Sequence, residues 1–324
     1  MSDSTLKLDN PIFIVGCPRS GTTKLSTILN RHSCIASATE THFFNFVSKQ
    51  KFNWKNFSVQ EFKRLLKESR IEDFTNLAGL NPEYLIEQFA EIENLSNDSA
   101  LIIEDFNKKK VFDLLVKNYL IKKNKIRFCE KTPQHIQNIG EILQIYSQAK
   151  IILMVRDGRD TVNSLLKMPW RPKGLLNNAR FWSHYVKIGK KESLRPEVIT
   201  IKYENLLERP QDTLISICNF IGEKFEDSLL DDSKDSDNLF SAWEASWKHK
   251  SKQELDSSRI NAWSRELSSD DQAILNWFLN KDLLEFGYQS ELPKLTLNQV
   301  LKILNQYFNL AFKKTYRLIA HIIN

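Results

Sequence analysis

A loop bounded by two glycines constrains the fold of this chain more than any other feature. An apolar block covers residues 12–15, the loop runs from Gly16 to Gly21, and residues 22–30 carry apolar side chains at helical spacing. Glycine is scarce, with nine residues in 324, so two at the ends of one short loop stand out. A strand, a tight loop and a helix N-terminus in this order point backbone N–H groups toward an anion. The sequence therefore predicts a phosphate-binding loop.

The spacing of the two glycines matches the nucleotide phosphate loop G-x-x-x-x-G-K-[ST], but Thr22 stands where the lysine belongs. Arg19 lies inside the loop instead, and its planar guanidinium supplies a fixed positive charge. We therefore expect the loop to bind phosphate but to suit ATP with magnesium poorly. The residues predicted to contact the phosphate are Arg19, Ser20, Gly21, Thr22 and Thr23.

A second segment repeats the order of strand, polar turn and helix. Residues 151–155 form an apolar block, Arg156 follows it, and Asp157 is a helix-capping residue before a helix predicted to run to about Lys167. Ser164 falls roughly two turns into that helix. The Arg156 fork and the Ser164 hydroxyl suit a second phosphate. Two phosphate sites at the ends of two strands favour a nucleotide phosphorylated at both ends.

Four short segments then resemble a known family, the sulfotransferases that use 3′-phosphoadenosine 5′-phosphosulfate (PAPS). PRSGTT at residues 18–23 and the R-x7-S spacing from Arg156 to Ser164 are similar to the 5′- and 3′-phosphate motifs of that family. ETHFF at residues 40–44 and EKTPQHI at residues 130–136 resemble segments of heparan sulfate sulfotransferases. MVRDGRD, together with PRSGTT, looks closer to the tyrosylprotein branch. Because the four occur in the family's order, the resemblance is specific.

The resemblance covers residues 11 to about 222. It implies PAPS as co-substrate and adenosine 3′,5′-bisphosphate as product. The chemistry of sulfuryl transfer requires no metal where side chains supply the positive charge, so we expect none. A catalytic glutamate follows the first loop in both branches, which assigns the general base to Glu40. The resemblance also assigns Arg19 to the 5′-phosphate and to the charge that builds on the bridging oxygen. Arg156 and Ser164 are assigned to the 3′-phosphate.

Three further residues each have a functional and a structural interpretation. His42 either orients Glu40 or contacts the substrate, or it is a partly buried polar residue. Lys131 either faces the sulfuryl group or the acceptor, or is a lysine whose stem lies along the surface. Tyr203 resembles a family tyrosine near the 3′-phosphate and adenosine, or it ends a strand at the edge of the core. A late basic segment closes over the 3′-phosphate in the family, and its candidates here are Lys248, Lys250, Lys252 and Arg259.

The order of apolar blocks predicts the fold class. Strand-like blocks alternate with helical stretches, which is typical of an α/β fold with a parallel sheet flanked by helices. We therefore expect a P-loop-like nucleotide-binding fold forming a single domain over residues 1–324. A helix-rich insertion is predicted at about 45–125, as a wall of the acceptor pocket, as a helical cover over the sheet, or as both. The predicted strands are residues 12–15, 34–38, 126–129, 151–155 and 198–202.

An amphipathic helix is predicted at about 296–324. Apolar side chains recur at three and four residues, with lysines and an arginine between them. Docking onto the body or onto a second subunit is one interpretation, and peripheral membrane attachment through a basic amphipathic face is the other. The segment is too interrupted by charge to span a bilayer.

Composition narrows the partners and the compartment. The net charge of +6 suits an anionic nucleotide and demands no nucleic acid, and no nucleic-acid module is recognisable. Four scattered cysteines have no metal-ligand spacing, which favours reduced thiols. The polar start runs straight into the first apolar block, so we predict a cytoplasmic enzyme, with membrane-peripheral attachment as the alternative.

The sequence therefore favours a PAPS-dependent sulfotransferase that acts on an acceptor hydroxyl of a carbohydrate, a tyrosine or a small molecule. One alternative is a metal-dependent P-loop kinase or NTPase, against which the missing loop lysine argues. The other is a non-catalytic nucleotide-binding adaptor.

Overall fold

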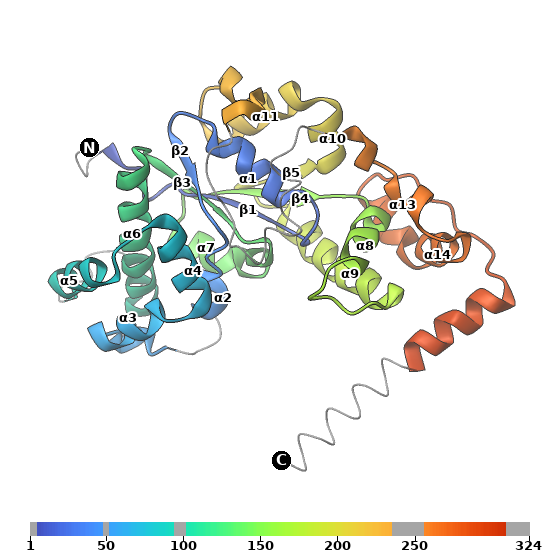
Figure 1. Ribbon diagram of the computed structural model, residues 1–324, viewed down its shortest axis with the longest axis horizontal. Coiled ribbons are helices and arrows are strands. Elements are labelled where there is room, and N and C mark those ends of the chain that lie inside the picture. Colours follow the sequence, from blue (N-terminus) through green and yellow to red (C-terminus); the bar gives the residue numbers. More distant parts are fainter. Residues whose placement is uncertain (1–4, 48–51, 94–101, 235–255, 309–324) are drawn as a thin grey trace, which may run out of the picture.

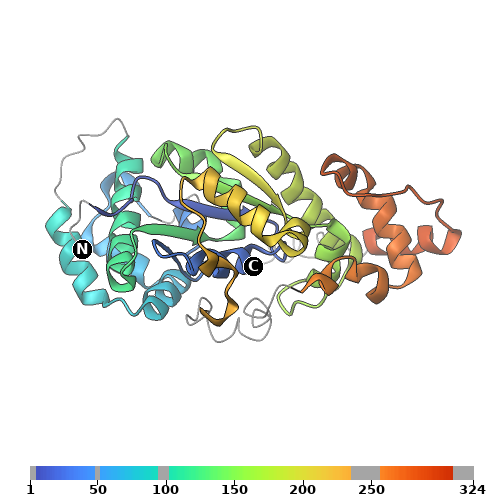
Figure 2. The same cartoon turned by 90° about the horizontal axis from the view of Figure 1, so that it is seen from above.

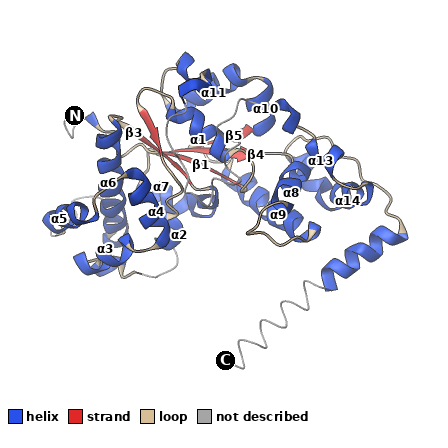
Figure 3. Cartoon of the chain, viewed as in Figure 1, coloured by secondary structure: helices blue, strands red, loops and turns tan. Residues whose placement is uncertain are grey.

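A five-stranded parallel sheet forms the centre of the protein. The computed structural model describes residues 5–47, 52–93, 102–234 and 256–308. All strand pairs are parallel, in the order β2-β3-β1-β4-β5 (Figures 1 and 3). Each predicted apolar block overlaps one strand, so the predicted fold class is confirmed. The strands are β1 (Ile12–Gly16), β2 (Ile35–Ser37), β3 (Arg127–Lys131), β4 (Lys150–Val155) and β5 (Val198–Lys202).

Helices cover both faces of the sheet, as buried parallel strands require. Successive side chains of β1 point to opposite faces, and all five of its residues are buried. Phe13 and Val15 pack toward α6 (Ile103–Lys123), α7 (Ile139–Ile145) and α9 (Leu175–Glu192). Ile12 and Ile14 pack toward the other layer, seen from above in Figure 2. That second layer consists of α1 (Thr22–Asn30), α10 (Tyr203–Glu208) and α11 (Pro210–Ile221).

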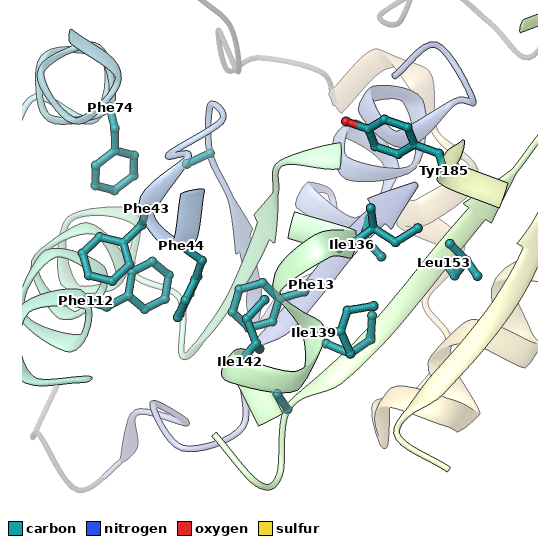
Figure 4. Packing of buried hydrophobic residues seen from close by; sticks show 14 of the residues in the cluster. Phe13, Phe43, Phe44, Phe74, Phe112, Ile136, Ile139, Ile142, Leu153 and Tyr185 are labelled. Carbon is teal, nitrogen blue, oxygen red and sulfur yellow. The ribbon is translucent and has the colours of Figure 1, made fainter. Parts of the chain in front are cut away.

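The predicted helical insertion lies between β2 and β3. Its aromatic side chains form a buried cluster in which Trp54 stacks on Phe57 at 4.4 Å between ring centroids. The cluster continues through Phe43, Phe44 and Phe112 to Phe13 of the sheet (Figure 4). These contacts fit the interpretation of the insertion as a cover over the sheet. Its helices are α2 (Phe43–Val47), η2 (Trp54–Asn56), α3 (Val59–Leu66), α4 (Ser69–Ala78), α5 (Pro82–Ile92) and α6.

The remaining helices follow β3 and β4 in the chain or lie in its C-terminal part. After β3 come η3 (Pro133–Asn138) and α7, and after β4 comes α8 (Gly158–Leu166), which Asp157 caps as predicted. The long helix α14 (Ser269–Glu285) packs against α8 and α9. The short elements are η4 (Asp227–Leu230), η5 (Asp232–Lys234), η7 (Ser257–Arg259) and α13 (Ala262–Glu266).

The C-terminal segment is helical over residues 297–308, and the rest of the predicted helix lies outside the described residues. It contacts the body through Gln299, Ile303 and Gln306: Gln299 donates to Asp270, and Gln306 accepts from the backbone N–H of Leu176. The described part of the helix therefore docks onto the body through this face and not through its apolar stripe, and docking of the stripe onto a second subunit stays a prediction. The stripe is exposed in this chain and consists of Leu297, Val300, Leu301, Leu304 and Phe308.

None of the helices in the described part of the chain combines the length and the apolar character that a bilayer span needs.

Candidate functional site

The candidate residues gather at the carboxyl ends of the parallel strands. The connection after β1 leads to β2, on one side of the sheet, while the connection after β4 leads to β5, on the other side. Ligands of open α/β sheets bind at such a switch point, outside the carboxyl ends of the strands. The loop after β1 and the turn after β4 are the two segments predicted to bind phosphate. The sheet therefore places both at one edge.

Two residues of the loop after β1 have a positive φ angle. Gly21 has a φ of +96° and precedes α1, while Arg19 adopts a φ of +77°, which is uncommon for a residue with a side chain. A Cβ on Gly21 would lie 2.2 Å from the ring of Tyr203, so the close approach requires glycine. Ser20 is fully buried, and its Oγ has no hydrogen-bond partner among the described residues. An unsatisfied buried hydroxyl in a loop of this kind fits a bound anion.

Three guanidinium groups crowd together at this loop. Arg19 Nε donates to Ser164 Oγ at 3.1 Å, and Arg156 donates to the carbonyl oxygens of Arg19 at 3.5 Å and of Arg259 at 2.9 Å. Burial and, after it, the nearby charges of Arg156 and Arg259 together lower the pKa of Arg19 to about 10. Arg156 also stacks on Tyr203, with its Cζ 4.8 Å from the ring centroid. The crowding of like charge in a buried place fits a site for a multiply charged anion.

A carboxylate and a lysine meet beside the loop. Glu40 follows β2 and Lys131 ends β3, and Lys131 Nζ donates to Glu40 Oε1 at 2.8 Å. The Lys131 side chain is fully buried, so it is not the surface lysine of the structural interpretation. His42 Nε2 lies 3.2 Å from Glu40 Oε2, outside hydrogen-bonding geometry, and His42 has a φ of +52°. The structure therefore brings together all three of these predicted residues.

A buried network that sequence reasoning missed fixes this turn. The Glu130 carboxylate accepts from Thr41 Oγ1 at 2.9 Å, from Thr132 Oγ1 at 2.6 Å and from His135 Nδ1 at 2.9 Å. The Thr132 hydroxyl in turn accepts from the backbone N–H of His42 at 3.2 Å. Burial raises the pKa of Glu130, but His135 and the hydroxyl donors outweigh it and hold that pKa below its usual range. Glu130 thus ties the residues next to Glu40 to the end of β3.

The other predicted residues divide into those at the site and those elsewhere. Thr22 is buried and Thr23 is half-buried in the first turn of α1. Burial raises the pKa of Tyr203, whose ring packs between Gly21 and Arg156. Of the late basic candidates, Arg259 lies at the guanidinium cluster, while Lys248, Lys250 and Lys252 fall outside the described residues.

A small cavity lies beneath the loop, between β4 and α9. It is lined by Cys17, Ser20, Arg156, Trp182, Tyr185 and other residues of these elements. Arg156 Nε is buried there without a hydrogen-bond partner among the described residues.

No group of three or more His, Cys, Asp and Glu side chains is placed to hold a metal ion within residues 5–47, 52–93, 102–234 and 256–308.

Comparison with known proteins identifies relatives of the chain. A model of the sulfotransferase family matches residues 11–227. Protein-tyrosine sulfotransferase 1 of Danio rerio is 26% identical over 231 residues, which cover 68% of this chain and 55% of that protein. Protein-tyrosine sulfotransferase A of Caenorhabditis elegans is 25% identical over 232 residues, covering 68% of this chain and 51% of that protein. The chain thus spans about half the length of these curated relatives.

Two solved structures share the fold. The sulfotransferase domain of the Synechococcus PCC 7002 olefin synthase is 19% identical, with a TM-score of 0.59, and the match covers 87% of this chain and 97% of that domain. The sulfotransferase domain of the curacin biosynthetic pathway is also 19% identical, with a TM-score of 0.57 and a match over 87% of this chain and 99% of that domain.

Proposed function

This chain belongs to the sulfotransferase family, and we propose that it transfers a sulfuryl group from PAPS to an acceptor hydroxyl, within one domain spanning residues 1–324. The observation that carries the proposal is the adjacency of two features at one sheet edge. One is the guanidinium cluster of Arg19, Arg156 and Arg259, and the other is the ion pair of Glu40 and Lys131. The first suits a nucleotide with two phosphate groups, and the second suits transfer of its sulfuryl group.

The residues of the loop and of α8 fit the phosphates of PAPS. We assign the 5′-phosphate to Arg19 and to the loop residues Ser20, Gly21, Thr22 and Thr23 at the start of α1. We assign the 3′-phosphate to Arg156 and Ser164, with Tyr203 beside the adenosine and Arg259 as the late basic residue. The contact between Arg19 and Ser164 implies that both phosphates are held by one continuous set of donors.

Transfer needs a base and a stabilised leaving group. In the proposed reaction the acceptor oxygen forms a bond to sulfur, the bond from sulfur to the 5′-phosphate oxygen breaks, and Glu40 takes the hydroxyl proton. The products are a sulfate ester and adenosine 3′,5′-bisphosphate. Arg19 stabilises the charge that grows on the bridging oxygen, and such preorganised contacts contribute ~3–4 kcal/mol to the transition state. No step in this scheme calls for a metal.

Lys131 and His42 act on the base in this proposal. Lys131 sits 2.8 Å from Glu40 Oε1 and holds that carboxylate in place until the acceptor arrives. It then lies next to the sulfuryl group, where its charge offsets the negative oxygens. His42 Nε2, 3.2 Å from the second carboxylate oxygen, orients Glu40 or contacts the acceptor.

Substitution of the base gives the most direct test of this mechanism. We expect Glu40→Gln to bind adenosine 3′,5′-bisphosphate as the wild type does but to lose most of its turnover, about 100-fold or more. Release of labelled sulfate from PAPS, to water or to added phenols, measures turnover without a known acceptor. Glu87→Gln, which changes an exposed carboxylate on α5, is the matched control. Near-normal turnover of Glu40→Gln would refute the base assignment.

The partners and the compartment remain part of the proposal. We propose an acceptor hydroxyl of a carbohydrate, a tyrosine or a small molecule, and a cytoplasmic or membrane-peripheral location. The exposed stripe on residues 297–308 suits either a membrane surface or a second copy of the chain. Liposome flotation measures membrane binding and sedimentation velocity measures self-association, each on wild type and on Leu301→Glu. If the variant matches the wild type in both measurements, the stripe binds neither a membrane nor a second copy of the chain.

A further inference from the structure

A guanidinium held rigidly in the segment between α8 and α9 has no role in the reaction described above. Arg171 stacks on Phe181, with its Cζ 3.8 Å from the ring centroid, and its Nε donates to Asn178 Oδ1 at 3.0 Å. Asn178 is fully buried and is itself fixed by donating to the carbonyl oxygens of Pro172 and Gly174. A planar group stacked on one side and bonded through its inner nitrogen keeps one orientation. Arg171 is therefore preorganised.

The charge of Arg171 has no counter-charge in the described part of the chain. No carboxylate among these residues lies within ion-pair distance of it, and its Nη2 is buried without a hydrogen-bond partner. Burial lowers the pKa of Arg171, which means that its surroundings disfavour the positive charge. Arg171 as a whole is half-buried, but a buried N–H donor such as its Nη2 is destabilising until a ligand supplies the missing acceptor.

Arg171 lies close to the transfer site. It stacks on Phe181, whose ring centroid lies 4.8 Å from that of Tyr185, and Tyr185 lines the cavity beneath the phosphate loop together with Cys17. The Tyr185 phenol is also within electrostatic reach of Glu40. Tyr185 lies at the edge of the apolar cluster, with its oxygen directed away from the neighbouring Ile136 (Figure 4). Ring contacts through Phe181 and Tyr185 therefore connect Arg171 to the cavity beneath the phosphate loop.

We propose that Arg171 determines acceptor specificity by binding an anionic group, a carboxylate or a sulfo group, that the acceptor carries near its reacting hydroxyl. The proposal rests on the function proposed above, since it takes Glu40 to mark the place of that hydroxyl. A guanidinium fork pairs with both kinds of anion through two parallel hydrogen bonds. A neutral acceptor would leave the buried Nη2 donor unsatisfied, so the site discriminates against it.

Pairs of compounds that differ only in charge test this inference by equilibrium binding. The probes are 4-hydroxyphenylacetate and its amide, methyl glucuronide and its amide, and 4-hydroxybenzenesulfonate and its sulfonamide. Each is titrated calorimetrically into protein saturated with adenosine 3′,5′-bisphosphate, so no turnover is needed. We expect at least one anion to bind about tenfold or more tightly than its neutral partner. The pair that shows the preference identifies a carboxylate or a sulfo group.

Variants show whether Arg171 is the source of the preference. Arg171→Gln should abolish it while leaving bisphosphate affinity unchanged, and Arg171→Lys should retain part of it because the charge remains. Arg180→Gln is the matched control, because Arg180 also stacks on an aromatic ring, that of Tyr307 at 5.2 Å, but is exposed. It should keep the full preference.

The outcomes separate the two proposals. If no anion binds more tightly than its neutral partner, or if the preference survives in Arg171→Gln, the inference about Arg171 is overturned. If the bisphosphate itself does not bind, the proposed function fails instead.

Discussion

The guanidiniums of Arg19, Arg156 and Arg259 repel one another in a buried place. Two of them have a carboxylate at the long end of ion-pair distance, with Asp160 at 3.7 Å from Arg156 and Asp256 at 3.7 Å from Arg259. Asp160 also accepts hydrogen bonds from the backbone N–H groups of Asn261 and Trp263, so its carboxylate is shared between Arg156 and these donors. A ligand with phosphate groups would relieve this repulsion, so binding and stability should be strongly coupled at this site.

Arg156→Lys should separate the two phosphate sites. A lysine keeps the charge but cannot donate to two carbonyl oxygens and stack on Tyr203 at once. We expect affinity for adenosine 3′,5′-bisphosphate to fall about 10- to 100-fold, and affinity for adenosine 5′-phosphosulfate, which lacks the 3′-phosphate, to stay unchanged. Calorimetric titration measures both, with the exposed Arg195→Lys as control. An equal loss for both ligands would contradict the assignment of Arg156 to the 3′-phosphate.

Glu130→Gln should destabilise the fold in a pH-dependent way. The pKa of Glu130 is held below its usual value of 4.5, so its ionised form stabilises the folded state. That contribution is fully present above pH 4.5 and is lost as the pH falls through the lower folded-state pKa. We expect the variant to lose about 2–3 kcal/mol of unfolding free energy at pH 7. The difference from wild type should shrink as the pH falls below 4.5.

Denaturant unfolding of both proteins at several pH values measures this difference. A gap that stays constant down to low pH would show that the charge of Glu130 is not what stabilises the turn. Because the turn carries His42 and adjoins Glu40, the variant should also lose turnover at pH 7.

At the scale of the element, the loop after β1 depends on its contact with the start of α10. Gly21→Ala would place a methyl group against the Tyr203 ring, and its φ of +96° disfavours a side chain. We expect a loss of ~1–3 kcal/mol in stability and a clear loss of bisphosphate affinity. Gly222→Ala is the matched control, because Gly222 also has a positive φ of +75° but no atom within 4 Å of the added methyl.

Thermal unfolding with and without the bisphosphate compares the two glycine variants. Both should be less stable, and only Gly21→Ala should lose affinity. Equal affinities in the two variants would show that the contact with Tyr203 does not shape the phosphate site.

Local pattern made the strands and the two phosphate-binding segments predictable. The apolar blocks at β1, β4 and β5 are short, continuous and followed by polar turns, and each block became a strand. Arg19, Arg156 and Glu40 stand at strand ends, where the sheet geometry brings them together. Glu130 was missed because it sits inside a strand, and only the three-dimensional pairing shows that its carboxylate reaches Thr41 of another strand's turn.

At the scale of the whole molecule, contacts between residues distant in sequence determine which face of a helix packs against the body, and the hydrophobic pattern of the sequence does not predict this. The amphipathic pattern of residues 297–308 predicted a helix correctly but not which face docks. Gln299, Gln306 and Lys302 bond to partners on α14 and α9, and these specific bonds turn the apolar stripe outward. Arg171 was likewise not singled out, because its stacking on Phe181 and the ring contact of Phe181 with Tyr185 appear only once the segment before α9 has folded against that helix.

The central claim is that the site binds a nucleotide phosphorylated at both ends. Titration of the full chain with adenosine 3′,5′-bisphosphate, followed by thermal unfolding, tests it most directly, with ATP plus magnesium and adenosine 5′-monophosphate as comparisons. A ligand at a hundred times its dissociation constant adds about 2.7 kcal/mol to the unfolding free energy, which is easily measured. The account predicts stabilisation by the bisphosphate well above that by either comparison ligand. Stabilisation by ATP with magnesium and none by the bisphosphate would contradict it.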